Sequence, residues 1–265
     1  MFEASTTTRR TSDTPPPALR RLLGEAAATF MPAGVSPYPL LRVPADTTLV
    51  HEGGLARTIY LVQAGHFKTV MNCEDGYEQV LDFVQADGLL GCDGLADGRY
   101  ASGAVALEDA WVVALPAVEI QRVVQQEPAF AARWQAAMAQ QIVRAGVRTW
   151  VMSAVGSEKR LARFLVKAMQ RQADRGESPH RLRLPMCRRD LGSHLGLSHE
   201  SVSRSFTLLD AAGLLRVNNR EVEVLDAKVL RSFASSTRGY AALRRGACAS
   251  GARADCLAAS AAGCA

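Results

Sequence analysis

Residues 184–215 read LPMCRRDLGSHLGLSHESVSRSFTLLDAAGLL. This stretch predicts two short helices, over residues 187–195 and 199–212, joined by a tight turn at residues 196–198. Two short helices with a glycine in the turn between them form the sequence outline of a helix-turn-helix. Gly213 ends the second helix, because glycine easily takes the left-handed conformation of a helix C-cap. A solvated helical hairpin without a nucleic-acid partner is the alternative.

Apolar residues at helical spacing give the two helices a common core. They are Leu191, Leu195, Leu197, Val202, Phe206 and Leu209. The opposite face of the second helix carries polar residues near its N-terminus, where a helix-turn-helix presents side chains to base edges in the major groove. Arg204 can donate two hydrogen bonds to guanine, Glu200 can accept one from cytosine, and Ser203 can contact either base. We therefore predict DNA base contacts by Glu200, Ser203, Arg204 and His199.

Contacts to DNA phosphates are predicted around the same helix. Such contacts fix the register of a protein on DNA without reading its sequence. The candidates are Arg188, Arg189, Ser198, Arg216 and Arg220. The last two lie in a predicted hairpin, residues 214–217 and 221–225, with an Asn-Asn turn that suits positive φ. This hairpin disfavours the alternative of a solvated helical hairpin without a nucleic-acid partner. We refer to residues 187–225 as the reading head.

Two helices are predicted before the reading head. Residues 158–171 form one, with Ser157 as its N-cap and Leu161, Phe164, Leu165 and Met169 facing inward. The other runs from Pro128 for about 28 residues and carries a stripe of residues at steps of three and four, which is typical of one helix face. We predict that this stripe contacts a second copy of the chain; packing on its own barrel is the alternative. The stripe contains Trp134, Met138, Ile142, Ala145, Thr149 and Met152.

Short β-like runs separated by glycine-containing turns occupy residues 40–116. The runs are 48–50, 58–62, 67–71, 79–84, 102–107 and 111–115. Short strands at near-even spacing predict an antiparallel sandwich or barrel. A short helical stretch at residues 119–126 follows.

The chain is accordingly divided into five parts. They are a flexible N-terminal arm at residues 1–35 with one short helix at 18–30, a β-barrel at 36–126, a dimerisation helix at 127–156, a winged helix-turn-helix at 157–232, and a flexible cysteine-containing tail at 233–265. The arm is rich in Thr, Ser, Arg and Pro and offers little to bury.

Composition and charge fit a DNA-binding protein that acts in the cytoplasm. The formal charge is +5, a mild basic excess. No stretch approaches the roughly 18 consecutive apolar residues of a membrane helix, and the N-terminus has no apolar signal segment. A cytoplasmic location is expected, where the six cysteines are reduced thiols or ligands.

The reading head resembles the DNA-binding region of the Crp/Fnr superfamily, and is most similar to its Fnr and FixK branch. The recognition helix of that branch carries E-x-x-S-R, here Glu200, Ser203 and Arg204, whereas the Crp branch has Gly where Ser203 stands. The resemblance covers roughly residues 40–230, including GLLGCDGLADGRYASGAVALEDAWVVALP at residues 88–116. It implies an α+β fold with a cyclic-nucleotide-binding-type antiparallel β-barrel, a long dimerisation helix and a C-terminal winged helix-turn-helix.

The resemblance also implies a function. A homodimer would bind double-stranded DNA at an inverted repeat of TTGAT half-sites, recruit RNA polymerase, and activate transcription. Regulators of this branch control genes for low-oxygen or nitrogen-oxide respiration. A cyclic-nucleotide-binding or iron–sulfur-dependent regulator of the same fold is the alternative.

Neither alternative sensor is favoured by the residues. The family's nucleotide site uses a Glu and an Arg-Ser pair, and Asp93, Arg99 and Ser102 match it poorly. No cysteine precedes Cys73, so the usual N-terminal cluster ligands are missing. The tail cysteines lie eight residues apart, unlike tight metal-binding spacing: Cys248, Cys256 and Cys264. We expect no metal and no cofactor, with a cluster bound by the tail as the alternative.

Cys187 is a candidate redox-sensitive thiol, and the sequence carries no pattern typical of an enzyme. Cys187 is expected at a helix N-terminus beside Arg188 and Arg189, an arrangement that favours a thiolate. We predict that its oxidation inactivates DNA binding; an inert cysteine is the alternative. An enzyme is not expected, since the barrel offers only His51 and His66 without metal-ligand spacing, and no phosphate loop or nucleophile elbow occurs.

Overall fold

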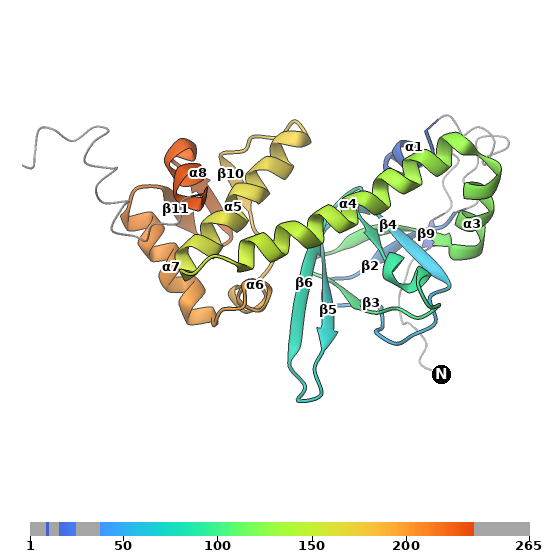
Figure 1. The fold of residues 1–265 in the computed structure, drawn as a ribbon, viewed down its shortest axis with the longest axis horizontal. Helices are drawn as coiled ribbons and strands as arrows, with labels where there is room; N and C mark the ends of the chain where they lie inside the picture. The colour runs from blue at the N-terminus through green and yellow to red at the C-terminus, as the bar shows by residue number, and fades with distance from the viewer. Residues whose placement is uncertain (1–8, 11–15, 25–37, 236–265) are drawn as a thin grey trace, which may run out of the picture. The chain divides into compact units, whose positions relative to one another are not determined.

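The computed structural model describes residues 9–10, 16–24 and 38–235 (Figure 1). The chain divides into two compact units, residues 1–146 and 147–265. The division falls inside one continuous helix, α4 (Pro128–Met152). The last turns of α4 therefore belong to the second unit. In the described residues, no helix has both the length and the apolar character needed to cross a membrane.

The first unit is built on two antiparallel sheets. The five-stranded sheet has the order β1 (Arg9–Arg10), β2 (Leu40–Val43), β9 (Ala110–Pro116), β4 (Thr58–Ala64) and β7 (Leu89–Leu90). The four-stranded sheet has the order β3 (Thr48–Val50), β8 (Gly103–Ala106), β5 (Phe67–Asn72) and β6 (Glu78–Val84). All six predicted runs are confirmed as strands. The prediction missed β2 and the two-residue strands β1 and β7, which are too short to show a period of two.

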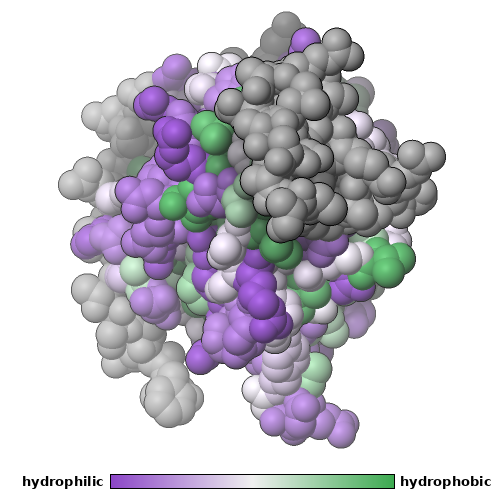
Figure 2. Space-filling view, turned by 90° about the vertical axis from the view of Figure 1, so that its left-hand side faces the viewer, coloured by the Kyte–Doolittle hydropathy of each residue, from purple (hydrophilic) through white to green (hydrophobic). Residues whose placement is uncertain are grey.

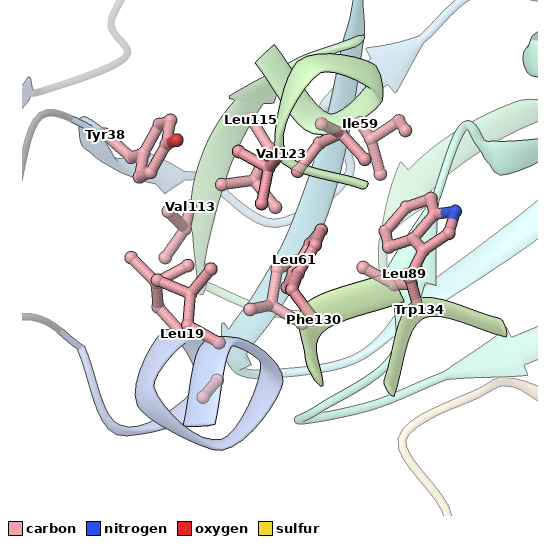
Figure 3. Close-up of a cluster of buried hydrophobic side chains, with 13 residues drawn as sticks. Leu19, Tyr38, Ile59, Leu61, Leu89, Val113, Leu115, Val123, Phe130 and Trp134 are labelled. Carbon is pink, nitrogen blue, oxygen red and sulfur yellow. The ribbon is translucent and has the colours of Figure 1, made fainter. Parts of the chain in front are cut away.

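Alternation along the strands creates two cores. One core joins both sheets and contains Val62 of β4, Phe67 of β5 and Val112 of β9. The other core lies on the opposite face of the five-stranded sheet, where Ile59 and Leu61 point (Figure 3). Three helices cover that face: α1 (Pro17–Leu23), α3 (Ala117–Gln126) and the first turns of α4.

The N-terminal arm contributes to this second core, which corrects the expectation that it buries little. Ala18, Leu19 and Leu23 of α1 are only 1%, 0% and 2% exposed. The backbone N–H of Ala18 donates to Gln63 Oε1 at 3.0 Å, which fixes the start of α1 on strand β4. The helix is shorter than the predicted 18–30, and residues 25–30 lie outside the described part of the chain.

The stripe on α4 is divided between two environments. Trp134 is 8% exposed and stacks on Phe130 with ring centroids 6.2 Å apart (Figure 3). Met138 packs against the same core. For Trp134 the predicted dimer contact is therefore corrected, because its side chain is buried against its own barrel. Further along, Ile142 is 74% exposed and its neighbour Val143 is 63% exposed. The remaining interface prediction thus concerns the partly buried Met138 together with Ile142, Ala145, Thr149 and Met152.

The second unit is a bundle of short helices with a three-stranded sheet of order β10-β12-β11. Its elements are α5 (Ser157–Asp174), β10 (Arg181–Arg183), α6 (Arg188–Leu195), α7 (His199–Ala211), β11 (Leu215–Asn218), β12 (Glu221–Val224) and α8 (Ala227–Ser235). Two expectations are corrected. Gly156, not Ser157, is the N-cap of α5, and no side chain caps it. Helix α8 extends past residue 232, because Phe233 and Ala234 are buried.

Candidate nucleic-acid interface

Helices α6 and α7 form the predicted helix-turn-helix. The last turn of α6 closes at Gly196, whose φ of 62° and ψ of 44° are left-handed. A second glycine, Gly192, permits the tight turn, because a Cβ there would lie 2.7 Å from the carbonyl oxygen of Leu197. Ser198 is the N-cap of α7, and its hydroxyl accepts from the backbone N–H of Ser201 at 3.2 Å.

The apolar face of the motif is confirmed. Leu191, Leu195, Val202, Phe206 and Leu209 are all at most 4% exposed. Leu197, in the turn, is half-buried. This core fixes which face of α7 is turned to solvent.

That solvent-exposed face carries the four predicted base-contacting residues. Arg204 Nη2 donates to Ser201 Oγ at 3.2 Å, and His199 Nε2 lies 3.2 Å from Glu200 Oε1. The pKa of Glu200 is lowered, first by a hydrogen bond from its own backbone N–H, then by the Ser198 hydroxyl and the neighbouring His199 and Arg204 charges. Glu200 is thus a carboxylate at neutral pH and able to accept hydrogen bonds.

Four of the five predicted phosphate contacts lie on exposed positions. Arg189, Ser198 and Arg220 are exposed. Arg216 Nη1 lies 3.4 Å from Glu223 Oε2 on the neighbouring strand, with 72% of its own side chain exposed. These positions fit phosphate binding, and the contacts themselves remain predictions.

Arg188 makes contacts within the reading head. Its guanidinium lies 3.7 Å from the centre of the Phe206 ring and donates to the Asn219 carbonyl at 3.0 Å. Burial lowers the pKa of this guanidinium. Asn219 has φ of 53° at the tip of the β11–β12 wing. Arg188 therefore connects the wing to the recognition helix, and its expected phosphate contact stays a prediction.

Cys187 is the N-cap of α6 and is exposed, as expected. Its sulfur accepts weakly from the Asp190 N–H at 3.4 Å, and its thiol donates to Asp190 Oδ2 at 3.0 Å. The neighbouring Arg188 is turned toward Phe206 instead of the sulfur. A carboxylate thus faces the thiol, one of the two expected cations is turned away from it, and the redox role stays a prediction.

The first unit has a polar loop where the resemblance places a nucleotide site. It contains η3 (Cys92–Leu95) and the residues up to Ser102. Asp93 Oδ2 accepts from the Ser102 hydroxyl at 2.6 Å, and Arg99 Nη1 donates to the Gly53 carbonyl at 2.6 Å. The buried Tyr100 hydroxyl donates to the Thr58 carbonyl at 2.6 Å. These polar groups are satisfied within the protein. No sequence pattern predicts these pairings, because they join residues that folding brings together.

The cysteines described in the first unit do not form a metal site. Among residues 9–10, 16–24 and 38–235, no three His, Cys, Asp or Glu side chains are grouped to hold a metal ion. Burial raises the pKa of Cys92 to about 12, with a further contribution from Asp93, so Cys92 is a neutral thiol. Cys248, Cys256 and Cys264, the residues of the alternative tail cluster, lie outside the described residues.

Surface character agrees with a polar partner. The face of the molecule drawn in Figure 2 carries mostly hydrophilic residues, with hydrophobic ones in small separate spots. Interfaces with nucleic acid are more polar than those between proteins.

Comparison with known proteins identifies the family. Residues 159–233 match the Crp-like helix-turn-helix domain, and residues 40–127 match the cyclic nucleotide-binding domain. The transcriptional regulatory protein btr of Bordetella pertussis is 35% identical over 193 residues, which cover 73% of this chain and 80% of the relative. The chain belongs to the Crp/Fnr family.

A second curated relative and a solved structure support the same family assignment. The fumarate and nitrate reduction regulatory protein of Escherichia coli is 30% identical over 194 residues, covering 73% of this chain and 78% of the relative. FixK2 from Bradyrhizobium japonicum has the same fold, with a TM-score of 0.69 at 21% identity over 76% of this chain and 99% of that chain. The family assignment makes this Crp/Fnr chain a helix-turn-helix transcription regulator with a cyclic-nucleotide-binding-like domain.

Proposed function

We propose that this Crp/Fnr regulator is a homodimer that binds an inverted repeat of TTGAT-type half-sites and activates genes for low-oxygen or nitrogen-oxide respiration. The observation that carries the proposal is the exposed Glu200, Ser203 and Arg204 face on a capped helix with a buried opposite side. The relative from Escherichia coli is a regulator of fumarate and nitrate reduction, which supports the gene class. RNA polymerase is the expected second partner, and both partners place the activity in the cytoplasm.

A second copy of the chain is expected along α4. Ile142 and Val143 are large apolar side chains that are 74% and 63% exposed in the single chain. Regulators of this family act as dimers. A helix pair through Ile142, Ala145 and Thr149 would cover this surface and place two recognition helices about 34 Å apart, one turn of DNA.

The regulator is proposed to bind DNA without a cyclic nucleotide. In the first unit, Ser102 donates to Asp93 and Arg99 donates to a backbone carbonyl. A cyclic nucleotide that used Arg99 and Ser102 would have to replace both of these hydrogen bonds. The alternative of a nucleotide-dependent regulator is therefore not favoured.

The test is binding of the purified full chain to a labelled TTGAT-N4-ATCAA duplex, in air and without added ligand, against a scrambled competitor. We expect specific binding with a steep salt dependence, because phosphate contacts release counterions. Binding that requires cyclic AMP would contradict the nucleotide-independent mode. Binding only without oxygen would indicate a labile cluster, and equal affinity for the scrambled duplex would exclude the proposed half-site.

A further inference from the structure

The guanidinium of Arg160, in the first turn of α5, joins two separate segments of the second unit. Its Nε donates to the Ala154 carbonyl at 2.9 Å. Its Nη1 donates to the carbonyls of Leu195 and Gly196, at 3.1 and 3.2 Å. Ala154 lies in the short connection between α4 and α5, whereas Leu195 and Gly196 end α6 at the turn of the helix-turn-helix. One side chain thus binds the connection that follows α4 and the start of that turn.

The contacts on α6 have a clear physical basis. The last carbonyls of a helix have no partner within the helix, and a cation near them is favourable. A guanidinium is planar and presents several N–H groups in a fixed fork, so it can serve carbonyls on two segments at once. A lysine ammonium is a single point charge and cannot reproduce this geometry.

Side-chain packing brings the same two segments together. A Cβ atom on Gly196 would lie 3.1 Å from Met152 Cε and 3.4 Å from Arg160 Nη1. Nothing larger than glycine fits between them without a shift. The last residue of α4 therefore lies directly against the turn that leads into α7.

Arg163, one turn further along α5, holds the end of α4 from another direction. Its Nη1 donates to the Trp150 carbonyl at 2.6 Å and to Ser153 Oγ at 3.1 Å. Its Nε donates to the Ala234 carbonyl at 3.0 Å, and its guanidinium lies 4.3 Å from the centre of the Trp150 ring. Arg163 anchors α4 to α8, whereas Arg160 binds the carbonyls at the turn of the reading head.

We infer that Arg160 is a positioning residue for DNA recognition, which fixes the reading head to the end of α4 and so sets the direction of α7. The inference rests on the proposed dimer and inverted repeat. In such a dimer the spacing of the two half-sites is matched by the spacing of the two recognition helices. Without Arg160, the reading head would be held to α5 by side-chain packing such as the Phe164–His194 ring contact, and we expect the direction of α7 to vary more, so that one spacing is less strongly preferred.

The test compares wild type with Arg160→Gln and Arg160→Lys on TTGAT inverted repeats whose spacer is the N4 length, one base pair shorter, or one longer. A single half-site is measured alongside, and thermal unfolding checks the fold. Arg175→Gln is the matched control, because Arg175 ends the same helix and pairs with Glu177 on the surface. The control removes the same charge and keeps the Arg160 contacts.

We expect wild type and Arg175→Gln to prefer one spacer. Both Arg160 variants should lose about tenfold of that preference, the scale of lost charge-assisted hydrogen bonds, while single half-site affinity changes little. Retained spacer preference in both variants overturns the inference, as does a wild type that binds all spacers equally. Equal loss on every duplex, including the half-site, shows a merely structural role and also overturns it. If Arg160→Gln does not fold, Arg160→Lys decides alone. A wild type without specific binding to any repeat instead refutes the proposed function.

Discussion

The polar face of α7 and the polar loop around η3 lie in the two different domains of the family. The side chains on α7 are exposed to solvent, whereas those around η3 are hydrogen-bonded within the protein. On α7, Glu200 and Arg204 are exposed and make only short-range contacts with their own helix among the interactions described. Around η3, Asp93 binds Ser102 and Arg99 binds the Gly53 carbonyl. The first arrangement leaves hydrogen-bonding capacity for a partner, whereas the second uses it to hold a loop.

The largest effect is expected for Phe206, which lies on the buried side of α7, opposite the exposed face. Phe206→Ala removes a ring that is 4% exposed and also carries the Arg188 guanidinium. We expect the free energy of unfolding to fall by about 3–5 kcal/mol, the usual cost of such a cavity. Urea unfolding measures it, with the exposed Thr207→Ala as control. A loss below about 1 kcal/mol would show that the face does not depend on this support.

Removal of a predicted base-contacting side chain tests the polar face of α7 directly. Arg204→Ala should reduce the preference for the TTGAT repeat over scrambled DNA by about tenfold to a hundredfold, or about 1–3 kcal/mol. Unfolding should be unchanged, because the side chain is exposed. Competition binding measures the ratio, and an unchanged ratio would remove Arg204 from base recognition.

A substitution in the polar loop around η3 should lower the stability of the protein and leave its DNA binding unchanged. Tyr100→Phe removes the hydroxyl that donates to the Thr58 carbonyl at 2.6 Å, and should cost about 1 kcal/mol of unfolding free energy. Cyclic AMP should leave the melting temperature of the wild type unchanged. A rise on adding the nucleotide would show that the loop opens to a ligand, which would break the contrast with α7.

Substitution of a predicted phosphate-binding arginine should reduce DNA affinity by a smaller factor, and by the same factor on every DNA sequence. Arg189→Gln should weaken binding to TTGAT and scrambled duplexes to the same degree, and lower the slope of log affinity against log salt by about 1. Titrations at several salt concentrations measure this slope. A change in the preference for the repeat would instead assign Arg189 to base recognition.

The smallest effect is expected for Cys187→Ser in the reduced protein, because serine is a good N-cap. After peroxide treatment the wild type should lose DNA binding, whereas the variant should keep it. Oxidation to a sulfinate would add negative charge about 3 Å from Asp190, where the thiol now donates at 3.0 Å. Equal sensitivity of both proteins would remove Cys187 as the oxidation site.

Local features of the sequence predicted the reading head well. The glycine turn, Ser198 as a cap and the apolar spacing from Leu191 to Leu209 all act within a few residues, and they are confirmed. Contacts over longer separations were missed. Arg160 meets Leu195 and Gly196, and Arg188 meets Asn219, because folding brings together segments whose sequences carry no sign of the pairing.

The α4 stripe and the N-terminal arm show a second limit. A helical stripe reveals that one face needs a partner, but it does not identify the partner. Trp134 contacts its own barrel, whereas Ile142 stays exposed in the single chain. Three buried residues in a Pro-rich and Thr-rich segment are too few to produce a clear period, so the burial of α1 could not be foreseen.

Helix α1 has a practical consequence for producing the protein. The part that matches the cyclic nucleotide-binding domain begins at residue 40, which suggests a natural place to trim the chain. Trimming there would strip Leu19 and Leu23, 0% and 2% exposed, from the sheet and leave an apolar patch facing water. Uncovered patches of this kind promote aggregation. Recombinant forms should therefore start before Pro16, even where the goal is the barrel alone.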